Sequence, residues 1–445
     1  MTGRIAAAMN AAFLAALARS LMAGEQTVEA ARARAMRTLG RRWRWAGPFA
    51  ARYIAAFRHG PRPRLKDVIA FIRADEGFDL AALTYGSKLS IAHWLAAPQR
   101  MLPYGPAADW DLPSIHTEGD LARWLALHAT ELDWLADRKN LCRKQANPKL
   151  RHYRYVIEPK RRGGIRLIES PKRLLKELQR RILAEILDRI PPHPAAHGFV
   201  KGRSIVTFAT PHTNQPLVMR LDLENFFPSF PAARVQALYR TLGYPDAVAD
   251  VLTGLCTTST LHDIVRAQTF EDRRLYEQRH LPQGAPTSPA LANAMAYRLD
   301  CRLSGLARTA GAVYTRYADD LAFSGGDEFR RNAHRFQHHA AAIALEEGFA
   351  VNFRKTRIMR QGVRQSLAGL VVNGGLSIRR RDLETLEAIL TNCLRHGPTS
   401  QNRANHGDFR AHLEGRISYV EMVHPEKGRR LRSLFDRIDS WANTL

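Results

Sequence analysis

The chain has 445 residues, with 67 Lys and Arg against 42 Asp and Glu, and a formal net charge of +25 at pH 7. This charge indicates a polyanionic partner. Nucleic acid fits better than a membrane, because no uncharged apolar run approaches the roughly 20 residues that span a bilayer. The four cysteines stand far apart, which argues against a zinc site or disulfide framework and favours a cytoplasmic protein. A chain of this length predicts two or three subdomains.

Residues 1–105 are predicted to form a basic, mostly helical extension that begins with an Ala-rich helix over residues 5–18. Trp43 and Trp45 of this extension are interleaved with arginines, namely Arg32, Arg34, Arg37, Arg41, Arg42 and Arg44. Arginine can grip phosphate while tryptophan stacks on bases. Equally, the tryptophans can pack inside the domain while the arginines stay solvated, so both interpretations remain open.

The segments that follow lead into a larger predicted domain. Residues 106–145 carry leucines and tryptophans at helical spacing, which predicts two short helices. Residues 152–159 and 165–169 flank a Gly163-Gly164 turn and predict a cationic β-hairpin. Lysine and arginine on such a hairpin could clamp a triphosphate.

Three aspartates are predicted to meet from two strands. The apolar strand of residues 217–221 ends on Asp222, and Asp319-Asp320 forms the tight turn of a later hairpin. An Asp pair alone would be ordinary turn chemistry. Three carboxylates together repel one another unless a cation neutralises them. The cluster therefore predicts two Mg²⁺ ions roughly 4 Å apart, for which Mn²⁺ can substitute.

Three motifs resemble those of reverse transcriptases and occur in that family's order. Residues 220–229 resemble its first palm motif, residues 281–289 its Gln-Gly-x-x-x-Ser-Pro motif, and residues 317–320 its Tyr-Ala-Asp-Asp catalytic turn. The resemblance implies an α+β right hand, in which residues 146–377 form fingers and a palm with an antiparallel sheet. A helical thumb would follow over residues 378–445. The implied reaction is Mg²⁺-dependent synthesis of DNA on RNA.

The resemblance also implies roles for single residues. The implied metal ligands are Asp222, Asp319, Asp320 and the backbone carbonyl of Leu223. Lys355 would protonate or stabilise the departing pyrophosphate. Phe227 would exclude a ribose 2′-OH, because strand alternation sends its neighbour Phe226 to the opposite face.

Further implied contacts lie outside the carboxylates. The dNTP would be bound by residues of the hairpin and the second motif, namely Lys160, Arg166, Gln283 and Gly284. Nucleic acid would be contacted by Tyr317, Arg203 and Gly369.

Three predictions concern local structure. Ser288 before Pro289 predicts the N-cap of a helix. Residues 367–373 predict a single strand. Residues 379–393 and 413–434 predict basic amphipathic helices for the thumb.

Within this family the chain resembles bacterial retron-type enzymes over residues 110–440, through features such as Arg316-Tyr-Ala-Asp-Asp and the Gly-Phe-x-x-Gly-Arg-Ser segment of residues 198–204. That resemblance implies a structured RNA as template and, through a guanosine 2′-OH, as primer. The same resemblance implies a branched RNA–DNA product, an RNA–DNA hybrid, an effector protein as partner and a role in defence against phage. Two departures from the retron pattern, at residues 208–212 and 367–369, imply altered RNA recognition with polymerisation intact.

Two alternatives stay open. One is a reverse transcriptase of another lineage, either group II intron-like or defence-associated without a retron RNA. The other is a catalytically idle RNA-binding protein on a polymerase scaffold. The intact Asp222, Asp319 and Asp320 argue against an idle protein, because metal binding is the evident reason to cluster three carboxylates.

Overall fold

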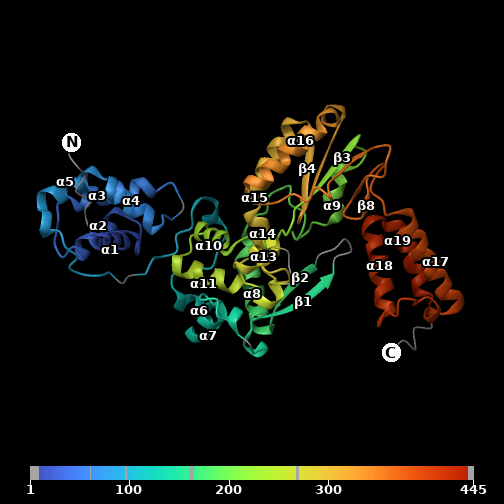
Figure 1. The fold of residues 1–445 in the computed structure, drawn as a ribbon, viewed down its shortest axis with the longest axis horizontal. Helices are drawn as coiled ribbons and strands as arrows, with labels where there is room; N and C mark the ends of the chain where they lie inside the picture. The colour runs from blue at the N-terminus through green and yellow to red at the C-terminus, as the bar shows by residue number, and fades with distance from the viewer. Residues whose placement is uncertain are drawn as a thin grey trace. The chain divides into compact units, whose positions relative to one another are not determined.

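The computed structural model describes residues 10–60, 62–95, 98–145, 147–159, 165–266 and 270–438. The chain divides into two compact units, one formed by Met1–Pro191 and Phe227–Met295 and the other by Pro192–Phe226 and Ala296–Leu445. Each unit therefore combines two separate stretches of chain, which the colour scale of Figure 1 separates. Among the described residues, no helix is long and apolar enough to cross a membrane.

Five helices lie near the start of the first unit (Figure 1). They enclose a hydrophobic core that contains several aromatic rings. They are α1 (Ala11–Met22), α2 (Val28–Thr38), α3 (Ala46–Phe57), α4 (Leu65–Ala74) and α5 (Glu76–Tyr85). Phe49 is fully buried, and its ring centroid lies 5.5 to 5.9 Å from those of Trp45, Phe71 and Phe78. Such ring clusters bury a large apolar area, which gives these helices a core of their own.

The tryptophans of the Arg-rich stretch point into this core. Trp43 is buried and its ring lies 4.6 Å from that of Tyr85, while Trp45 packs against Phe49 and Phe78. The packing interpretation is therefore the correct one for both tryptophans. The exposed arginines of this stretch are Arg32, Arg37, Arg41, Arg42 and Arg44.

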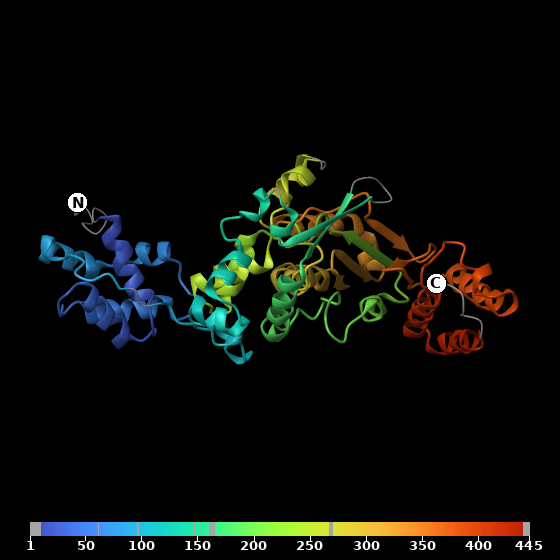
Figure 2. The ribbon, with the colours of Figure 1, turned by 90° about the horizontal axis from the view of Figure 1, so that it is seen from below.

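The rest of the first unit contains a long hairpin and a set of helices. Strands β1 (Tyr153–Pro159) and β2 (Ile165–Pro171) pair antiparallel in continuous register, as predicted, and the connecting residues 160–164 lie outside the described ranges. The helices are α6 (Glu118–Leu125), α7 (Ala129–Ala136), α8 (Arg173–Glu185), α10 (Ala232–Thr241), α11 (Asp246–Cys256), α12 (His262–Val265), α13 (Phe270–Glu277) and α14 (Ser288–Met295). Figure 2 shows the hairpin and these helices from below.

The second unit is built on a four-stranded antiparallel sheet with the order β4-β5-β3-β6. Its strands are β3 (Leu217–Asp222), β4 (Ala312–Tyr317), β5 (Asp320–Gly325) and β6 (Arg357–Arg360). Helices α15 (Tyr297–Thr309) and α16 (Asp327–Glu346) pack on it. Phe323 of β5 is fully buried between Tyr314 of β4 and Phe336 of α16, with both ring centroids 4.9 Å away.

The opposite face of the sheet is also covered. Neighbouring residues of a strand point to opposite faces, so Ala322 lies on the other face from Phe323. Ala322 and Val218 pack there with Phe208 of the short helix α9 (Ile205–Ala209). The short strands β7 (Ser366–Leu367) and β8 (Leu370–Val371) belong to the same cluster. The sheet is therefore covered on both faces. This packing fixes the register of its strands, including the residues at their ends.

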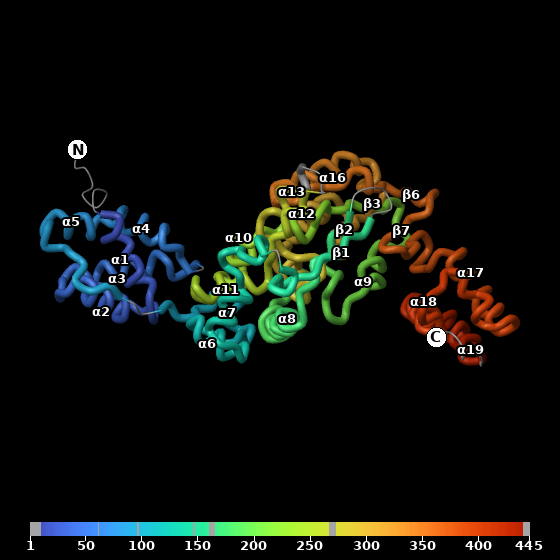
Figure 3. The backbone as a smooth tube through the Cα atoms, turned by 60° about the horizontal axis from the view of Figure 1, so that its bottom comes forward, coloured from blue at the N-terminus to red at the C-terminus, as the bar shows by residue number. Residues whose placement is uncertain are grey.

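Three helices after the sheet form a bundle with a separate core (Figure 3). They are α17 (Arg380–His396), α18 (Phe409–Val423) and α19 (Pro425–Asp436). Leu390, Leu413 and Ile417 are fully or almost fully buried among them. This bundle occupies the position along the chain that was predicted for a helical thumb.

Several local predictions were wrong in detail. The predicted helix over residues 413–434 is two helices, because Pro425 cannot continue α18 and instead occupies the first turn of α19. The predicted strand over residues 367–373 is broken at Ala368-Gly369, where both φ angles are positive. Ser288 is already the first helical residue, and the carbonyl of Thr287 accepts the first helical hydrogen bond.

Candidate active site

The β4–β5 hairpin presents two aspartates at its tip. Tyr317 and Asp320 are Cα partners that close the turn, which leaves Ala318 and Asp319 as the two turn residues. Ala318 has a φ of 55°, a left-handed conformation that tight hairpin turns require. The hairpin predicted from the sequence is confirmed, but its turn lies one residue earlier than predicted, because Asp320 already belongs to β5.

The third aspartate comes from the neighbouring strand. In the antiparallel register of β3 and β5, Asp222 is the Cα partner of Asp320. The pairing continues one residue further, where the backbone N–H of Leu223 donates to the carbonyl oxygen of Asp319 at 2.9 Å. Three carboxylates from two strands thus lie at one end of the sheet.

The surroundings of Asp319 and Asp320 raise the pKa values of both carboxyls. Burial, and then the charges of Asp320 and Asp222, raise the pKa of Asp319 to about 6. Burial also raises the pKa of Asp320, an effect that the Arg220 guanidinium opposes. Like charges in a poorly solvated site disfavour ionisation, so this end of the sheet attracts a cation.

Two basic side chains hold two of the three carboxylates. The Nζ of Lys355 donates to both oxygens of Asp222, at 3.0 and 2.9 Å. The Nε of Arg220 donates to Oδ1 of Asp320 at 2.9 Å. Lys355 was predicted to belong to the site, whereas Arg220 was not. The sequence could have identified Arg220, because Arg220 stands two residues before Asp222 and therefore on the same face of β3.

A buried ion pair supports the β4–β5 turn. Asp300 of α15 and Arg316 of β4 are fully buried and form a two-pronged contact, with N–O distances of 2.8 and 2.7 Å. Tyr314 donates to the same carboxylate at 2.8 Å, and Nη1 of Arg316 donates to the carbonyl of Ala318 at 3.2 Å. The pair thereby fixes the backbone of the turn that carries Asp319.

Comparison with known proteins identifies this arrangement. A sequence profile described as "Reverse transcriptase (RNA-dependent DNA polymerase)" matches residues 158–380, about half of the chain. The retron Mx65 reverse transcriptase of Myxococcus xanthus is 43% identical over 324 residues, which are 73% of this chain and 72% of that protein. The chain belongs to the retron reverse transcriptases. It is an RNA-directed DNA polymerase of a retron, and RNA is its template.

Two further relatives support the family assignment. The retron Mx162 reverse transcriptase of Myxococcus xanthus is 36% identical over 340 residues, covering 73% of this chain and 67% of that protein. The retron Ec86 reverse transcriptase of Escherichia coli is 32% identical over 289 residues, covering 64% of this chain and 80% of that protein.

A solved telomerase from Candida albicans, bound to a fragment of telomeric RNA, has a TM-score of 0.37 at 11% identity, covering 72% of this chain and 59% of that one.

Reverse transcriptases generally depend on a divalent metal ion, and the donor set of this reverse transcriptase suits one. Asp222, Asp319 and Asp320 offer only carboxylate oxygens, the ligands that Mg²⁺ prefers. Within the described ranges, however, no three His, Cys, Asp or Glu side chains are gathered closely enough to hold a metal as they stand. Lys355 and Arg220 hold Asp222 and Asp320 in ion pairs.

The residues predicted to bind the dNTP lie in the first unit, apart from Lys160, which is outside the described residues. Arg166 is exposed on β2. The carbonyl of Gln283 accepts from the N–H of Glu169 at 2.8 Å. Gly284 has a φ of 128°, and a Cβ there would lie 3.1 Å from the side chain of Ile168. Close packing on β2 is therefore one reason for this glycine.

Phe227 was assigned through strand alternation, and that reasoning was wrong. Strand β3 ends at Asp222, and Asn225 has a φ of 47°, so Phe226 and Phe227 lie in a turn where strand alternation does not apply. Phe226 is nonetheless buried and stacks on Phe349 at 5.8 Å, while Phe227 is half-buried.

The three residues predicted to contact nucleic acid have different surroundings. Tyr317 is half-buried, with its ring 5.7 Å from that of Phe208. The Nη1 of Arg203 donates to the carbonyls of Pro194 and Ala196, at 2.7 and 2.5 Å, which ties this arginine to its own loop. Gly369 forms the β7–β8 turn with a φ of 89°.

Sequence reasoning also missed the role of His212. Its two ring nitrogens lie 2.7 Å from the hydroxyls of Ser324 on β5 and Thr315 on β4. Burial lowers the pKa of His212 to about 3, so the ring is neutral. This histidine links both strands of the catalytic hairpin to the segment after α9. It lies in one of the two stretches that depart from the retron pattern.

Proposed function

We propose that this retron reverse transcriptase polymerises DNA at the end of the sheet formed by β3, β4 and β5. We further propose that it joins this DNA to its RNA template through an internal guanosine 2′-OH. The observation that carries the polymerisation site is the register that sets Asp222 opposite Asp320, with Asp319 in the adjoining turn.

Asp222, Asp319, Asp320 and the carbonyl of Leu223 would hold two Mg²⁺ ions, with Mn²⁺ as a substitute. When bound, such ions activate the attacking hydroxyl and stabilise the charge that develops on the transferred phosphate. The raised pKa of Asp319 supports this role, because a site that disfavours its own negative charge gains free energy from a cation.

The chain's basic residues would supply the remaining electrostatics. Lys355 holds a proton on Nζ within 3.0 Å of Asp222 and can release it to the departing pyrophosphate. Arg220 orients Asp320 through the hydrogen bond from its Nε. Both side chains offset the charge of the carboxylates before a cation binds.

Substrate contacts are proposed for further residues. Phe227 would exclude nucleotides with a 2′-OH. The dNTP would be gripped by Lys160, Arg166, Gln283 and Gly284. The RNA–DNA hybrid would be contacted by Tyr317, Arg203 and Gly369. A cytoplasmic location, an effector protein partner and a role in defence against phage are further proposals, which rest on membership of the retron family.

The test is to express the gene with about a kilobase of flanking DNA, purify the protein and sequence the nucleic acid that copurifies. We expect a short DNA that stays attached to RNA until a 2′,5′ debranching enzyme is added. Unlinked RNA with retained primer extension would overturn the branched product and leave the polymerase in place.

The carboxylate assignment is tested in the same preparation. The double variant Asp319→Asn and Asp320→Asn should lose DNA synthesis by about 10³-fold or more, because the amides are poor metal ligands. Asp327→Asn is the matched control, since Asp327 is an exposed residue on α16 that pairs with Arg330. Full synthesis by the double variant would refute the site.

A further inference from the structure

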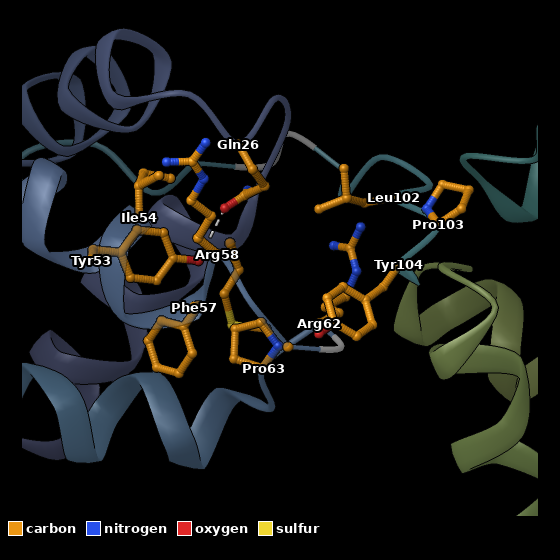
Figure 4. Close-up of a pocket in the computed structure, with 12 residues that line it drawn as sticks. Gln26, Tyr53, Ile54, Phe57, Arg58, Arg62, Pro63, Leu102, Pro103 and Tyr104 are labelled. Atoms are coloured by element: carbon orange, nitrogen blue, oxygen red, sulfur yellow. Dashed lines mark hydrogen bonds between the residues drawn. The ribbon is translucent and has the colours of Figure 1, made fainter. Parts of the chain in front are cut away.

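A pocket of about 250 Å³ opens in the N-terminal part of the first unit, whereas the three carboxylates belong to the second unit. Its walls come from α3, from Arg58, Arg62 and Pro63 beyond this helix, and from residues 102–104 (Figure 4). The volume is close to the lower limit of ordinary small-ligand pockets, which begin at about 300 Å³.

Aromatic rings line two sides of this pocket. Tyr53 and Phe57 lie together on one side, with ring centroids 5.4 Å apart, and Figure 4 draws Tyr104 on the other side. The hydroxyl of Tyr53 donates to Gln26 at 3.1 Å, and that of Tyr104 donates to the carbonyl of His59 at 2.5 Å. Tyr53 is fully buried, whereas Tyr104 is exposed and its tied hydroxyl holds its ring in place for a flat ligand.

A buried arginine lines the same pocket without a full set of partners. Arg62 is 9% exposed, and its guanidinium lies between Leu102 and Tyr104 in Figure 4. One terminal nitrogen donates to the carbonyl of Arg100, but Nε is buried without a hydrogen-bond partner. An unpaired buried donor on a charged group costs free energy, so this site favours an acceptor from outside the chain.

No acidic side chain in the described part of the chain neutralises Arg62 by an ion pair. Asp246 acts on it electrostatically, but the carboxylate of Asp246 makes its own ion pair with Arg240 at 2.6 Å. Arg58, which also lines the pocket, is exposed and adds a second positive charge. The missing partner is therefore an anion.

We propose that this pocket binds a nucleotide, with its base beside the rings of Phe57 and Tyr104 and its phosphate on Arg62. A flat ring beside an anion is the ligand that aromatic faces and a guanidinium recognise together. The nucleotide can be free in solution or an unpaired residue of an RNA. Residues 1–105 hold 16 Lys and Arg against 6 Asp and Glu, which suits either source.

The experiment uses the full chain in EDTA, so that metal-dependent nucleotide binding at the polymerase site does not contribute. Titration calorimetry follows AMP and UMP, with ribose 5-phosphate as the ligand that lacks a base. A second arm compares an RNA hairpin containing one unpaired nucleotide with the same hairpin fully paired. We expect a mononucleotide to bind more tightly than ribose 5-phosphate, or the interrupted hairpin more tightly than the paired one.

Two pairs of variants decide whether the pocket is responsible. Arg62→Gln should weaken binding about tenfold or more, because it removes a charge-assisted contact, while Arg73→Gln, on the exposed side of α4, should not. Tyr104→Leu should weaken binding, while Tyr104→Phe, which keeps the ring, should not. If Arg62→Gln lowers the melting temperature, the comparison of the two Tyr104 variants decides whether the pocket binds the nucleotide.

The two arms separate the sources of the nucleotide. Loss of mononucleotide binding in Arg62→Gln and Tyr104→Leu would establish a site for free nucleotides. Loss confined to the interrupted hairpin would establish a site for an unpaired RNA residue. Equal binding by all variants, or no preference for a base in either arm, would overturn the proposal. Primer extension by the same variants should be unchanged, which keeps this outcome distinct from failure of the polymerase site.

Discussion

At the scale of single residues, the β4–β5 turn depends on a fully buried arginine side chain. Arg316 is fully buried and is neutralised by Asp300, which comes from a helix and not from the sheet. A buried ion pair adds little net stability over apolar packing, but removal of one partner leaves a charge with no compensation. The pair therefore acts mainly by keeping one backbone geometry at Ala318.

Asp300→Asn should lower the free energy of unfolding by about 3–5 kcal/mol, because it leaves the buried guanidinium of Arg316 without a neutralising charge. The measurement is thermal unfolding of the full chain, with primer extension at low temperature to separate folding from activity. Asp327→Asn breaks an exposed pair and should cost at most about 1 kcal/mol. Equal melting temperatures for the two variants would contradict the role given to Asp300.

Phe227 allows a second prediction at this scale. Phe227→Ala should raise incorporation of ribonucleotides relative to deoxyribonucleotides about tenfold or more, because the bulk that meets the 2′-OH is removed. Single-nucleotide insertion with matched dNTP and rNTP measures the ratio. Phe227→Tyr keeps the ring and is the control. An unchanged ratio in Phe227→Ala would refute the assignment of Phe227.

At the scale of elements, the β4–β5 hairpin is hydrogen-bonded to the segment that precedes β3. His212 is fully buried and lies 2.7 Å from the hydroxyls of Thr315 and Ser324, one on each strand. Thr315 in turn donates to the carbonyl of Phe208 at 3.0 Å. The segment that departs from the retron pattern is therefore part of the support for β4 and β5.

This arrangement predicts a pH dependence of stability. The pKa of His212 is about 3 in the fold, below its ordinary value of 6.5, so the fold favours the neutral ring. The stabilisation is complete above pH 6.5 and should fall by up to about 1.4 kcal/mol per pH unit as the pH drops from 6.5 towards 3.

Melting temperatures between pH 7.5 and 5 test this dependence. The parent protein should lose stability more steeply than His212→Asn, which cannot take up the proton. His338→Asn, at an exposed position on α16, should follow the parent. Identical slopes for the parent and His212→Asn would refute the buried neutral histidine.

At the scale of the whole molecule, the charge of +25 is the dominant electrostatic property. Part of this charge is concentrated in the N-terminal helices, where five arginines between positions 32 and 44 are exposed while the tryptophans beside them face the core. A surface of this kind attracts phosphate without reading sequence, and its contribution is screened by salt.

Replacement of Arg37, Arg41 and Arg42 by Gln should reduce the salt dependence of RNA binding. Each lost phosphate contact lowers the slope of log K against log salt by about 0.7–0.9, so the triple variant should lose about 2 units. Binding is measured by fluorescence anisotropy from 50 to 400 mM KCl. The control replaces three exposed arginines on α15 and α16, namely Arg308, Arg331 and Arg335.

A slope that is unchanged in the N-terminal triple variant, or reduced equally in the control, would show that this surface has no special part in RNA binding. Primer extension on a preannealed substrate at low salt separates the two functions. It should be unaffected in both variants, because neither set contains a carboxylate or a proposed substrate contact.

Sequence patterns were sufficient where alternation or a short motif carries the information. Alternation and turn residues predicted the β1–β2 and β4–β5 hairpins and the strand that ends on Asp222, and three short motifs were enough for the family. They failed where a single residue redirects the chain. Asn225 ends the alternation before Phe227, and Ala368-Gly369 divide a predicted strand, because a positive φ is a property of one residue and not of a period.

The sequence by itself therefore indicated the family and the three aspartates, because each motif that carries them is a short run of residues. Only the tertiary structure decided what surrounds them. Lys355 reaches Asp222 across 133 positions, and His212 reaches Ser324 across 112. Arg316 finds Asp300 only because α15 packs on β4. Such partners are set by how elements pack, and the periodicity of a segment carries no information about which distant side chain will face it.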